Sequence, residues 1–247
     1  MRKLSKRKFG DRRDGVLLRD IDSIHFVMPL IYPNRCDNEA FISERIDITN
    51  LEKFLEVKNM DNPEYKYNMF QAIVSALLKA ITLRPKMNRF IANKNMYQRN
   101  EISASFVVKK LFSDNGGEAL SFIHSKDTFT FEDIHNEIYR QVSFCRDETK
   151  TDTSTNAMDI FNKMPRFISK AIISLACFLD KRGKLPDALI ATDPYYASVI
   201  LTNLGSIKLN SGYHHLTNWG TTSIFAVIGE KKKRPFYDDE GNVTIRE

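Results

Sequence analysis

The sequence predicts an α+β fold, in the form of a two-layer sandwich in which amphipathic helices cover a mixed β-sheet. Three observations lead to this class. Strand-like and helix-like segments are mixed along the chain without strict β-α-β alternation. Several segments carry wide apolar stripes at helical spacing. The chain has 247 residues, of which 42% are hydrophobic and 17 are Phe, so it can bury a substantial core.

The chain divides into a short arm and one large domain. Residues 1–15 are polar and basic, which predicts an extended arm, and residues 16–247 form the domain. Residues 147–155 read as a polar linker or a surface excursion. Because the segments on both sides of this stretch need sheet partners, the sequence favours one domain over two.

The first elements of the domain are predicted from apolar runs and from caps. Residues 24–32 form an apolar run that predicts a buried strand, which its prolines limit to an edge or a bend. Residues 40–48 alternate between apolar and polar side chains, as a half-buried strand does. Thr49 or Asn50 then caps a short helix over residues 51–58.

The clearest helix is predicted between two Pro-containing boundaries. Asn62 caps it and Pro63 suits its first turn, while Arg84-Pro85 ends it. Its apolar stripe consists of Met69, Phe70, Ile73, Val74, Leu77, Leu78 and Ile81.

The middle of the chain predicts strands followed by a helix. Residues 90–97 and 102–112 supply strands, and residues 115–117 (Asn-Gly-Gly) form a turn. Thr130 begins a stretch that resembles a capping box, which predicts a helix through Arg146.

The last third predicts one helix and two strands. Pro165 begins the helix and Gly183 terminates it. Residues 198–202 form a strand that residues 203–206 break, and residues 221–228 form the second strand. The side chains expected to face inward from the helix are Ile168, Ala171, Ile172, Leu175, Ala176 and Leu179.

Cysteine usage and hydropathy limit the cofactors and the compartment. Cys36, Cys145 and Cys177 are widely spaced, without a Cys-x-x-Cys pair, so we expect no metal site and no disulfide framework. No apolar run reaches membrane-spanning length, and no apolar segment follows the basic N-terminus as in a secretory signal. The expected compartment is the cytoplasm, with no membrane partner.

The positive charge allows a nucleic-acid alternative. The net charge is +6, and the excess lies largely at the N-terminus and at Lys231–Arg234. Clustered cations gain affinity for phosphates by releasing counterions. Because no RNA- or DNA-binding motif accompanies these cations, nucleic-acid binding is the weakest of the function hypotheses.

Three short motifs carry a resemblance to a known family. The first is Thr202-Asn203-Leu204-Gly205 at the end of a strand, followed by the apolar strand 223–229. The second is Asp47-x-Thr49-x-Leu51 before a helix, and the third is the Pro-x-x-Asn of residues 85–88. In these features, from about residue 16 to 247, the chain resembles the acyltransferase catalytic domain of 2-oxoacid dehydrogenase complexes, whose fold is shared with chloramphenicol acetyltransferase.

The resemblance implies an activity, a substrate and an assembly. It implies acyl transfer between thiols, with coenzyme A or acyl-coenzyme A as one substrate and possibly a lipoyl group as the other. It also implies a homotrimer in which each site takes residues from two subunits. Thr202 matches the hydroxyl that stabilises the oxyanion in this family.

The family's base is a His in a C-terminal Asp-His-Arg-x-x-Asp-Gly signature, which is not present in these residues. His215 is the one weak candidate, because Gly220 stands at the right distance although Trp219 replaces the Asp. We expect surface or interface packing for His214 and His215. The missing signature leaves an alternative open, namely a non-catalytic trimeric scaffold or binding module of the same fold.

Overall fold

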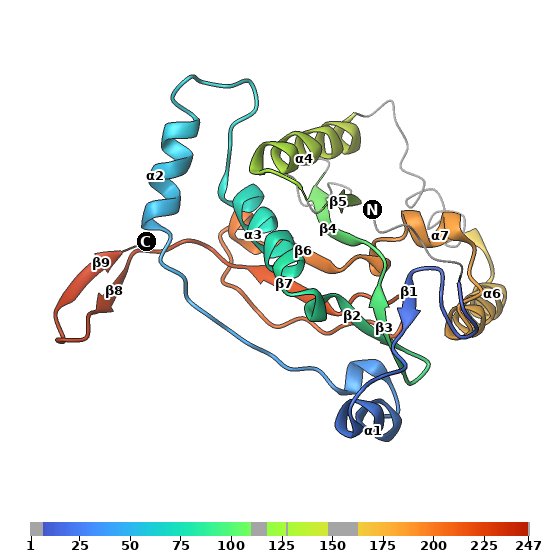
Figure 1. Ribbon diagram of the computed structural model, residues 1–247. Helices are drawn as coiled ribbons and strands as arrows, with labels where there is room; N and C mark the ends of the chain where they lie inside the picture. Colours follow the sequence, from blue (N-terminus) through green and yellow to red (C-terminus); the bar gives the residue numbers. More distant parts are fainter. Residues whose placement is uncertain (1–6, 110–117, 127, 148–162, 247) are drawn as a thin grey trace.

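The structure is a computed structural model that describes residues 7–109, 118–126, 128–147 and 163–246 (Figure 1). It confirms the predicted α+β class with a mixed sheet. The strands of the described residues form three sheets, in the orders β1-β3-β2, β5-β4-β6-β7 and β8-β9. Their bounds are β1 Gly15–Leu17, β2 Arg89–Ala92, β3 Asn95–Arg99, β4 Ile102–Lys109, β5 Glu118–Ser125, β6 Val199–Asn203, β7 Ile224–Ile228, β8 Arg234–Tyr237 and β9 Val243–Arg246.

The four-stranded sheet holds the main core. β4 pairs with β5 in antiparallel and with β6 in parallel, and β6 pairs with β7 in parallel. The helices α3 (Met69–Leu83) and α4 (Phe131–Arg146) lie together over this sheet (Figure 1). The buried side chains between the two layers include Val74, Leu78, Ile81, Phe106, Ile134, Ile138, Val199 and Leu201. Burial of these groups is the main stabilising contribution to the domain.

The start of α3 corrects the sequence prediction. The helix begins at Met69, and its cap is Asn68, whose side chain accepts a hydrogen bond from the Gln71 N–H. Asn62 instead has a left-handed backbone, with φ of 48°. The reciprocal bond from the Asn68 N–H to the Gln71 side chain makes Asn68 the stronger start signal. The predicted end is confirmed, since α3 stops before Arg84-Pro85.

Two predicted strands near the N-terminus are wrong. The apolar run forms helix α1 (Ser23–Ile31), because the Asp22 carboxylate caps it by accepting the His25 N–H. Residues 40–48 are not assigned to a strand, and most of their side chains are exposed. The helix that follows, α2 (Thr49–Lys58), begins at the residue expected to cap it, and the Asp47 carboxylate accepts the Thr49 N–H at 2.9 Å.

The two predicted later helices have the expected ends. Thr130 and Asp133 exchange the hydrogen bonds of a capping box at the start of α4. Helix α6 (Arg166–Lys181) follows Pro165, and Gly183, with φ of 63°, ends it. The side chains of α6 expected to face inward are largely exposed, so that part of the prediction is wrong. A short helix, α7 (Asp187–Thr192), leads towards β6.

Part of the expected arm is packed into the domain. The Arg12 side chain is 3% exposed and donates to both Asp14 and Asp180. The hairpin of β8 and β9 turns at residues 238–242. The expected turn at residues 115–117 and nearly all of the polar stretch 147–155 lie outside the described residues. None of the helices that the structure describes is long and apolar enough to cross a membrane.

Candidate active site at the crossover between β6 and β7

Thr202 lies near the end of β6, where the chain leaves the sheet. It is half-buried and lies in register with Val227 of β7. No hydrogen bond joins its hydroxyl to another residue in the described part of the chain. A half-buried hydroxyl without such a partner is free to donate to a ligand.

The turn after Thr202 explains the sequence Asn-Leu-Gly. The Asn203 side chain accepts the Ser206 N–H at 3.3 Å and so caps a 3₁₀ turn over Leu204–Ile207. A Cβ atom at Gly205 would lie 2.6 Å from the carbonyl oxygen of Gly229, so a larger residue would separate the turn from the end of β7. The motif therefore fixes where β6 ends and where Thr202 stands.

The crossover chain from β6 to β7 is held by Arg35. Its guanidinium donates to the carbonyl oxygens of Thr217 and Gly220, at 3.0 Å each, and also to that of Thr222. Burial lowers the pKa of Arg35. Gly220 has φ of 74°, and a Cβ there would lie 2.3 Å from the Tyr195 carbonyl oxygen. The loop that carries the two histidines is therefore fixed at its second half.

A second arginine holds the same loop from inside the molecule. Arg99 donates to the carbonyl oxygens of Tyr196 at 2.5 Å and Thr221 at 2.6 Å. Burial lowers the pKa of Arg99 to about 10. The Thr221 hydroxyl donates to Asp14 at 3.0 Å, which connects the loop to the ion pairs of Arg12. Burial opposes the charge of Arg12, but its two carboxylate partners outweigh burial and raise its pKa.

His215 has a carboxylate partner that is distant in the sequence. Its Nδ1 lies 2.7 Å from a carboxylate oxygen of Glu39, and the Leu216 N–H donates to the other oxygen at 2.5 Å. The Glu39 side chain is 7% exposed, whereas that of His215 is 81% exposed. The neighbouring His214 stacks on Phe225, with ring centroids 3.9 Å apart.

The Glu39 contact was missed by the sequence reasoning. That reasoning looked for an acid four residues after each His, where His215 has Trp219, and the Trp219 indole N–H donates instead to Asp193. With Nδ1–H donating to Glu39, the neutral imidazole presents Nε2 as a proton acceptor. The pair becomes visible only in the structure, where residues 38–44 run beside the loop that carries His215.

A groove of about 700 Å³ runs beside β7. It is lined by residues 38–44, 211–214, Leu216 and 223–227. His214 and Val227 line it, whereas neither Thr202 nor His215 is among its lining residues. The structure thus brings the two site candidates to the same crossover, but not into one cavity.

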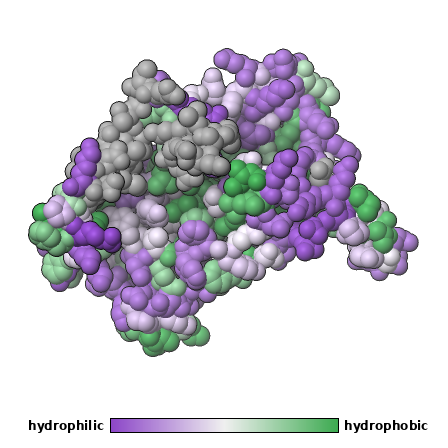
Figure 2. Space-filling model, turned by 180° about the vertical axis from the view of Figure 1, so that it is seen from behind, coloured by the Kyte–Doolittle hydropathy of each residue, from purple (hydrophilic) through white to green (hydrophobic). Residues whose placement is uncertain are grey.

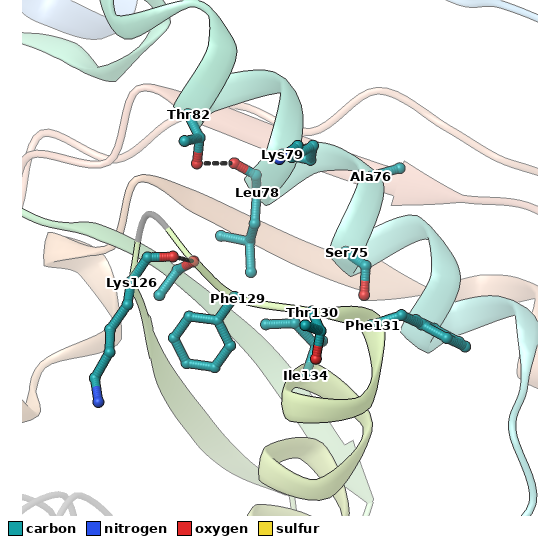
Figure 3. Close-up of a pocket in the computed structure, with 11 residues that line it drawn as sticks. Ser75, Ala76, Leu78, Lys79, Thr82, Lys126, Phe129, Thr130, Phe131 and Ile134 are labelled. Atoms are coloured by element: carbon teal, nitrogen blue, oxygen red, sulfur yellow. Dashed lines mark hydrogen bonds between the residues drawn. The ribbon is translucent and has the colours of Figure 1, made fainter.

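A smaller cavity of about 340 Å³ lies between α3 and the start of α4 (Figure 3). Leu78, Phe129 and Ile134 lie around its interior, and the Thr82 hydroxyl is bonded within its own helix, to the Leu78 carbonyl oxygen. Lys126 extends away from the cavity (Figure 3). The hydroxyl groups of Ser75, Ser125 and Thr130 in its lining are likewise engaged in local hydrogen bonds, so this cavity is less suited to chemistry than the groove. In the described part of the chain, no group of three or more His, Cys, Asp or Glu side chains could hold a metal ion.

The sequence matches no protein-family model and no curated protein. Solved structures are similar in fold. A probable dihydrolipoamide acetyltransferase from Listeria monocytogenes is 15% identical, with a TM-score of 0.57, over 92% of this chain and 80% of that chain. The cubic core of the pyruvate dehydrogenase multienzyme complex is 13% identical, with a TM-score of 0.57, over 94% and 79%.

Dihydrolipoamide acetyltransferase from Azotobacter vinelandii is 14% identical, with a TM-score of 0.53, over 82% of this chain and 66% of that chain. That structure belongs to an investigation of the roles of a Ser, a His and an Asn in its catalytic mechanism. At 13–15% identity these similarities concern the fold. The chain therefore has the fold of the dihydrolipoamide acetyltransferase catalytic domain, which is the chloramphenicol acetyltransferase-like fold that the sequence motifs indicated.

Proposed function

We propose that this chain is a coenzyme A-dependent acyltransferase-type domain that moves an acyl group between two thiols. The observation that carries the proposal is the shared fold, which extends over 92–94% of the chain in two of the acyltransferase structures. The position of Thr202 supports it, because a half-buried hydroxyl stands where the strand leads into the Asn-Leu-Gly turn. The second thiol would belong to a dihydrolipoyl group or a related dithiol.

The proposed reaction has two steps. The acceptor thiolate attacks the thioester carbonyl carbon of acyl-coenzyme A and forms a tetrahedral oxyanion. The Thr202 O–H donates a hydrogen bond to this oxyanion. The intermediate then expels coenzyme A as its thiolate, which takes up the proton that the acceptor thiol lost. Thr202 therefore has a role in the transition state and only a small one in substrate binding.

His215 is the candidate for the general base of this reaction. Glu39 orients the His215 ring as a carboxylate orients a catalytic imidazole. However, Thr202 and His215 share neither a contact nor the groove within one chain. We therefore assign the oxyanion role to Thr202 and expect weak activity from a single chain. We further propose a homotrimer located in the cytoplasm.

The alternative is a non-catalytic trimeric scaffold or binding module with the same fold. It is favoured by the separation of the two candidate residues and by the absence of the His-containing signature from these residues. Such a module would assemble and bind its partner without accelerating acyl transfer. The two functions therefore differ in one readout, namely the rate of thiol release.

The test is a Thr202→Val variant assayed with acetyl-coenzyme A and dihydrolipoamide. We expect the transfer rate to fall by about 10²–10³-fold with little change in KM, because an oxyanion donor acts in the transition state. Thr192→Val is the matched control, since Thr192 is exposed at the end of α7. An equal rate in wild type and Thr202→Val would remove Thr202 from the mechanism.

A further inference from the structure

Helix α6 presents an apolar face to solvent. At about 100° per residue, this face covers about 140° of the helix circumference. Phe167 is 73% exposed, Leu175 is 59% exposed and Phe178 is 49% exposed. The α6 apolar face consists of Phe167, Ile168, Ala171, Ile172, Leu175 and Phe178. A monomer in water rarely exposes a patch of this kind without a partner.

The exposed charges on α6 are all positive. Arg166, Lys170 and Lys181 stand on the other side of the helix, and the chain continues with a further Arg and Lys after it. The one acid within the helix, Asp180, is buried, and its carboxylate lies 2.6 Å from the guanidinium of Arg12. Because Asp180 is paired with Arg12 inside the molecule, no acidic side chain of α6 offsets the positive charge on its surface.

The C-terminal end of α6 is fixed to the domain, and this anchor sets the direction of the apolar face. The Arg12 guanidinium binds both the carboxylate and the carbonyl oxygen of Asp180. The Gly183 N–H donates to the same carbonyl oxygen at 2.8 Å. Figure 1 shows α6 at the edge of the molecule, away from the α3 and α4 layer. In the view from behind, hydrophobic and hydrophilic groups lie next to each other along that edge (Figure 2).

We propose that α6 docks this protein onto an anionic membrane surface, with the helix parallel to the bilayer and its apolar face among the upper acyl chains. A helix that is apolar on one side, and whose exposed charges on the other side are all positive, is complementary to a surface that is apolar inside and negatively charged outside.

A search of the sequence for long apolar runs does not find an amphipathic helix of this kind. Ser169, Lys170 and Ser174 interrupt the apolar residues of α6, so the sequence contains no spanning segment, while the folded helix still separates two faces. The proposal therefore departs from the expectation that the protein has no membrane partner, which rested on the length of the apolar runs. Docking through α6 is independent of the proposed acyl transfer, since it involves neither Thr202 nor His215.

The test is co-sedimentation of the full chain with lipid vesicles. We expect binding to phosphatidylcholine vesicles that contain about one third phosphatidylglycerol, weaker binding to phosphatidylcholine alone, and release by salt. The double variant Phe167→Ser, Phe178→Ser should lower the partition coefficient at least about tenfold, because two aromatic groups lose their apolar environment. Lys170→Gln with Lys181→Gln should reduce the preference for the anionic vesicles.

The control is Phe26→Ser with Ile31→Ser on α1, which removes two equally exposed apolar groups elsewhere. This variant should bind vesicles as wild type does. The circular dichroism spectrum and the melting temperature should not change in this control or in the Phe167→Ser, Phe178→Ser variant, because all four replaced side chains are exposed. The proposal is overturned if wild type does not bind anionic vesicles, or if the α6 variant without Phe167 and Phe178 binds them as well as the α1 control variant does. It is also overturned if the α6 variant changes only the sedimentation of the lipid-free protein, because a second copy then covers the face.

Discussion

His135 is a histidine whose surroundings favour the neutral ring. Its side chain lies in α4, stacked on Tyr67 with ring centroids 3.9 Å apart, and its Nδ1 lies 3.1 Å from the Gln71 side-chain oxygen. Burial lowers the pKa of His135, and this effect outweighs the attraction of Glu132. Protonation is therefore easier in the unfolded chain than in the folded one.

We expect a pH-dependent stability from this residue. Because the folded pKa lies below the unfolded value of about 6.5, the free energy of unfolding is highest above that pH and decreases as the pH falls through it. His135→Gln should weaken the pH dependence of the melting temperature between about pH 7 and pH 5. The control His214→Gln, which replaces an exposed histidine, should leave this dependence unchanged. A wild-type slope that persists in His135→Gln would show that other groups cause it.

The site residues differ in how far the sequence could locate them. Thr202 was found because its partners in the motif follow it directly, and the turn that they form is local. Glu39 was not found, because its contact with His215 spans 176 residues and depends on the position of residues 38–44 beside β7. The catalytic roles of Thr202 and His215 remain proposals.

Among the elements, those with local caps were predicted best. The helix α4 has its Thr130–Asp133 capping box, and α6 lies between Pro165 and Gly183, so both have the expected ends. The apolar run at α1 was predicted as a strand from its apolar composition, and the helix-capping residue Asp22 in front of it was not considered. The orientation of α6 was wrong because periodicity defines an apolar face and cannot say whether another element covers it.

The crossover loop between β6 and β7 gives a prediction at the scale of one element. Gly220→Ala places a Cβ atom where the Tyr195 carbonyl oxygen stands and requires an unfavourable φ. We expect a loss of about 2 kcal/mol or more, seen as a melting temperature lower by about 5 °C or more. Gly212→Ala in the same loop is the control, since a Cβ there meets no atom within 4 Å. Equal melting of the two variants would mean that Gly220 does not constrain the loop.

At the scale of the whole molecule, short motifs predicted the fold because each one marks a junction between elements. Asp47-x-Thr49 starts α2, and the Pro-x-x-Asn of residues 85–88 forms a turn between α3 and β2. The sequence did not predict the interior ion pairs. Arg12 and Asp180 are separated by 168 residues, and a charged residue in a basic stretch carries no signal that it will be buried.

The proposed homotrimer is also a prediction at this scale. The exposed apolar side chains of the β8–β9 hairpin, among them Tyr237, Val243 and Ile245, leave surface for subunit contact. Analytical ultracentrifugation at micromolar concentration in the absence of lipid should give the mass of three chains, which is about three times 28.6 kDa. A single species of one chain's mass at all concentrations would contradict both the acyltransferase and the scaffold proposals.

The most direct measurement of the central claim is thiol release from acetyl-coenzyme A with dihydrolipoamide, from about pH 6 to about pH 9, with and without the protein. A thiol with an ordinary pKa of about 8.5 supplies more thiolate as the pH rises. If Thr202 acts without a dedicated base, the catalysed rate should be slow at neutral pH and should increase to the end of the range without a plateau. A fast rate that levels off near pH 7 would instead show that a base such as His215 works within this chain. A rate equal to the protein-free control at every pH would contradict the acyltransferase account.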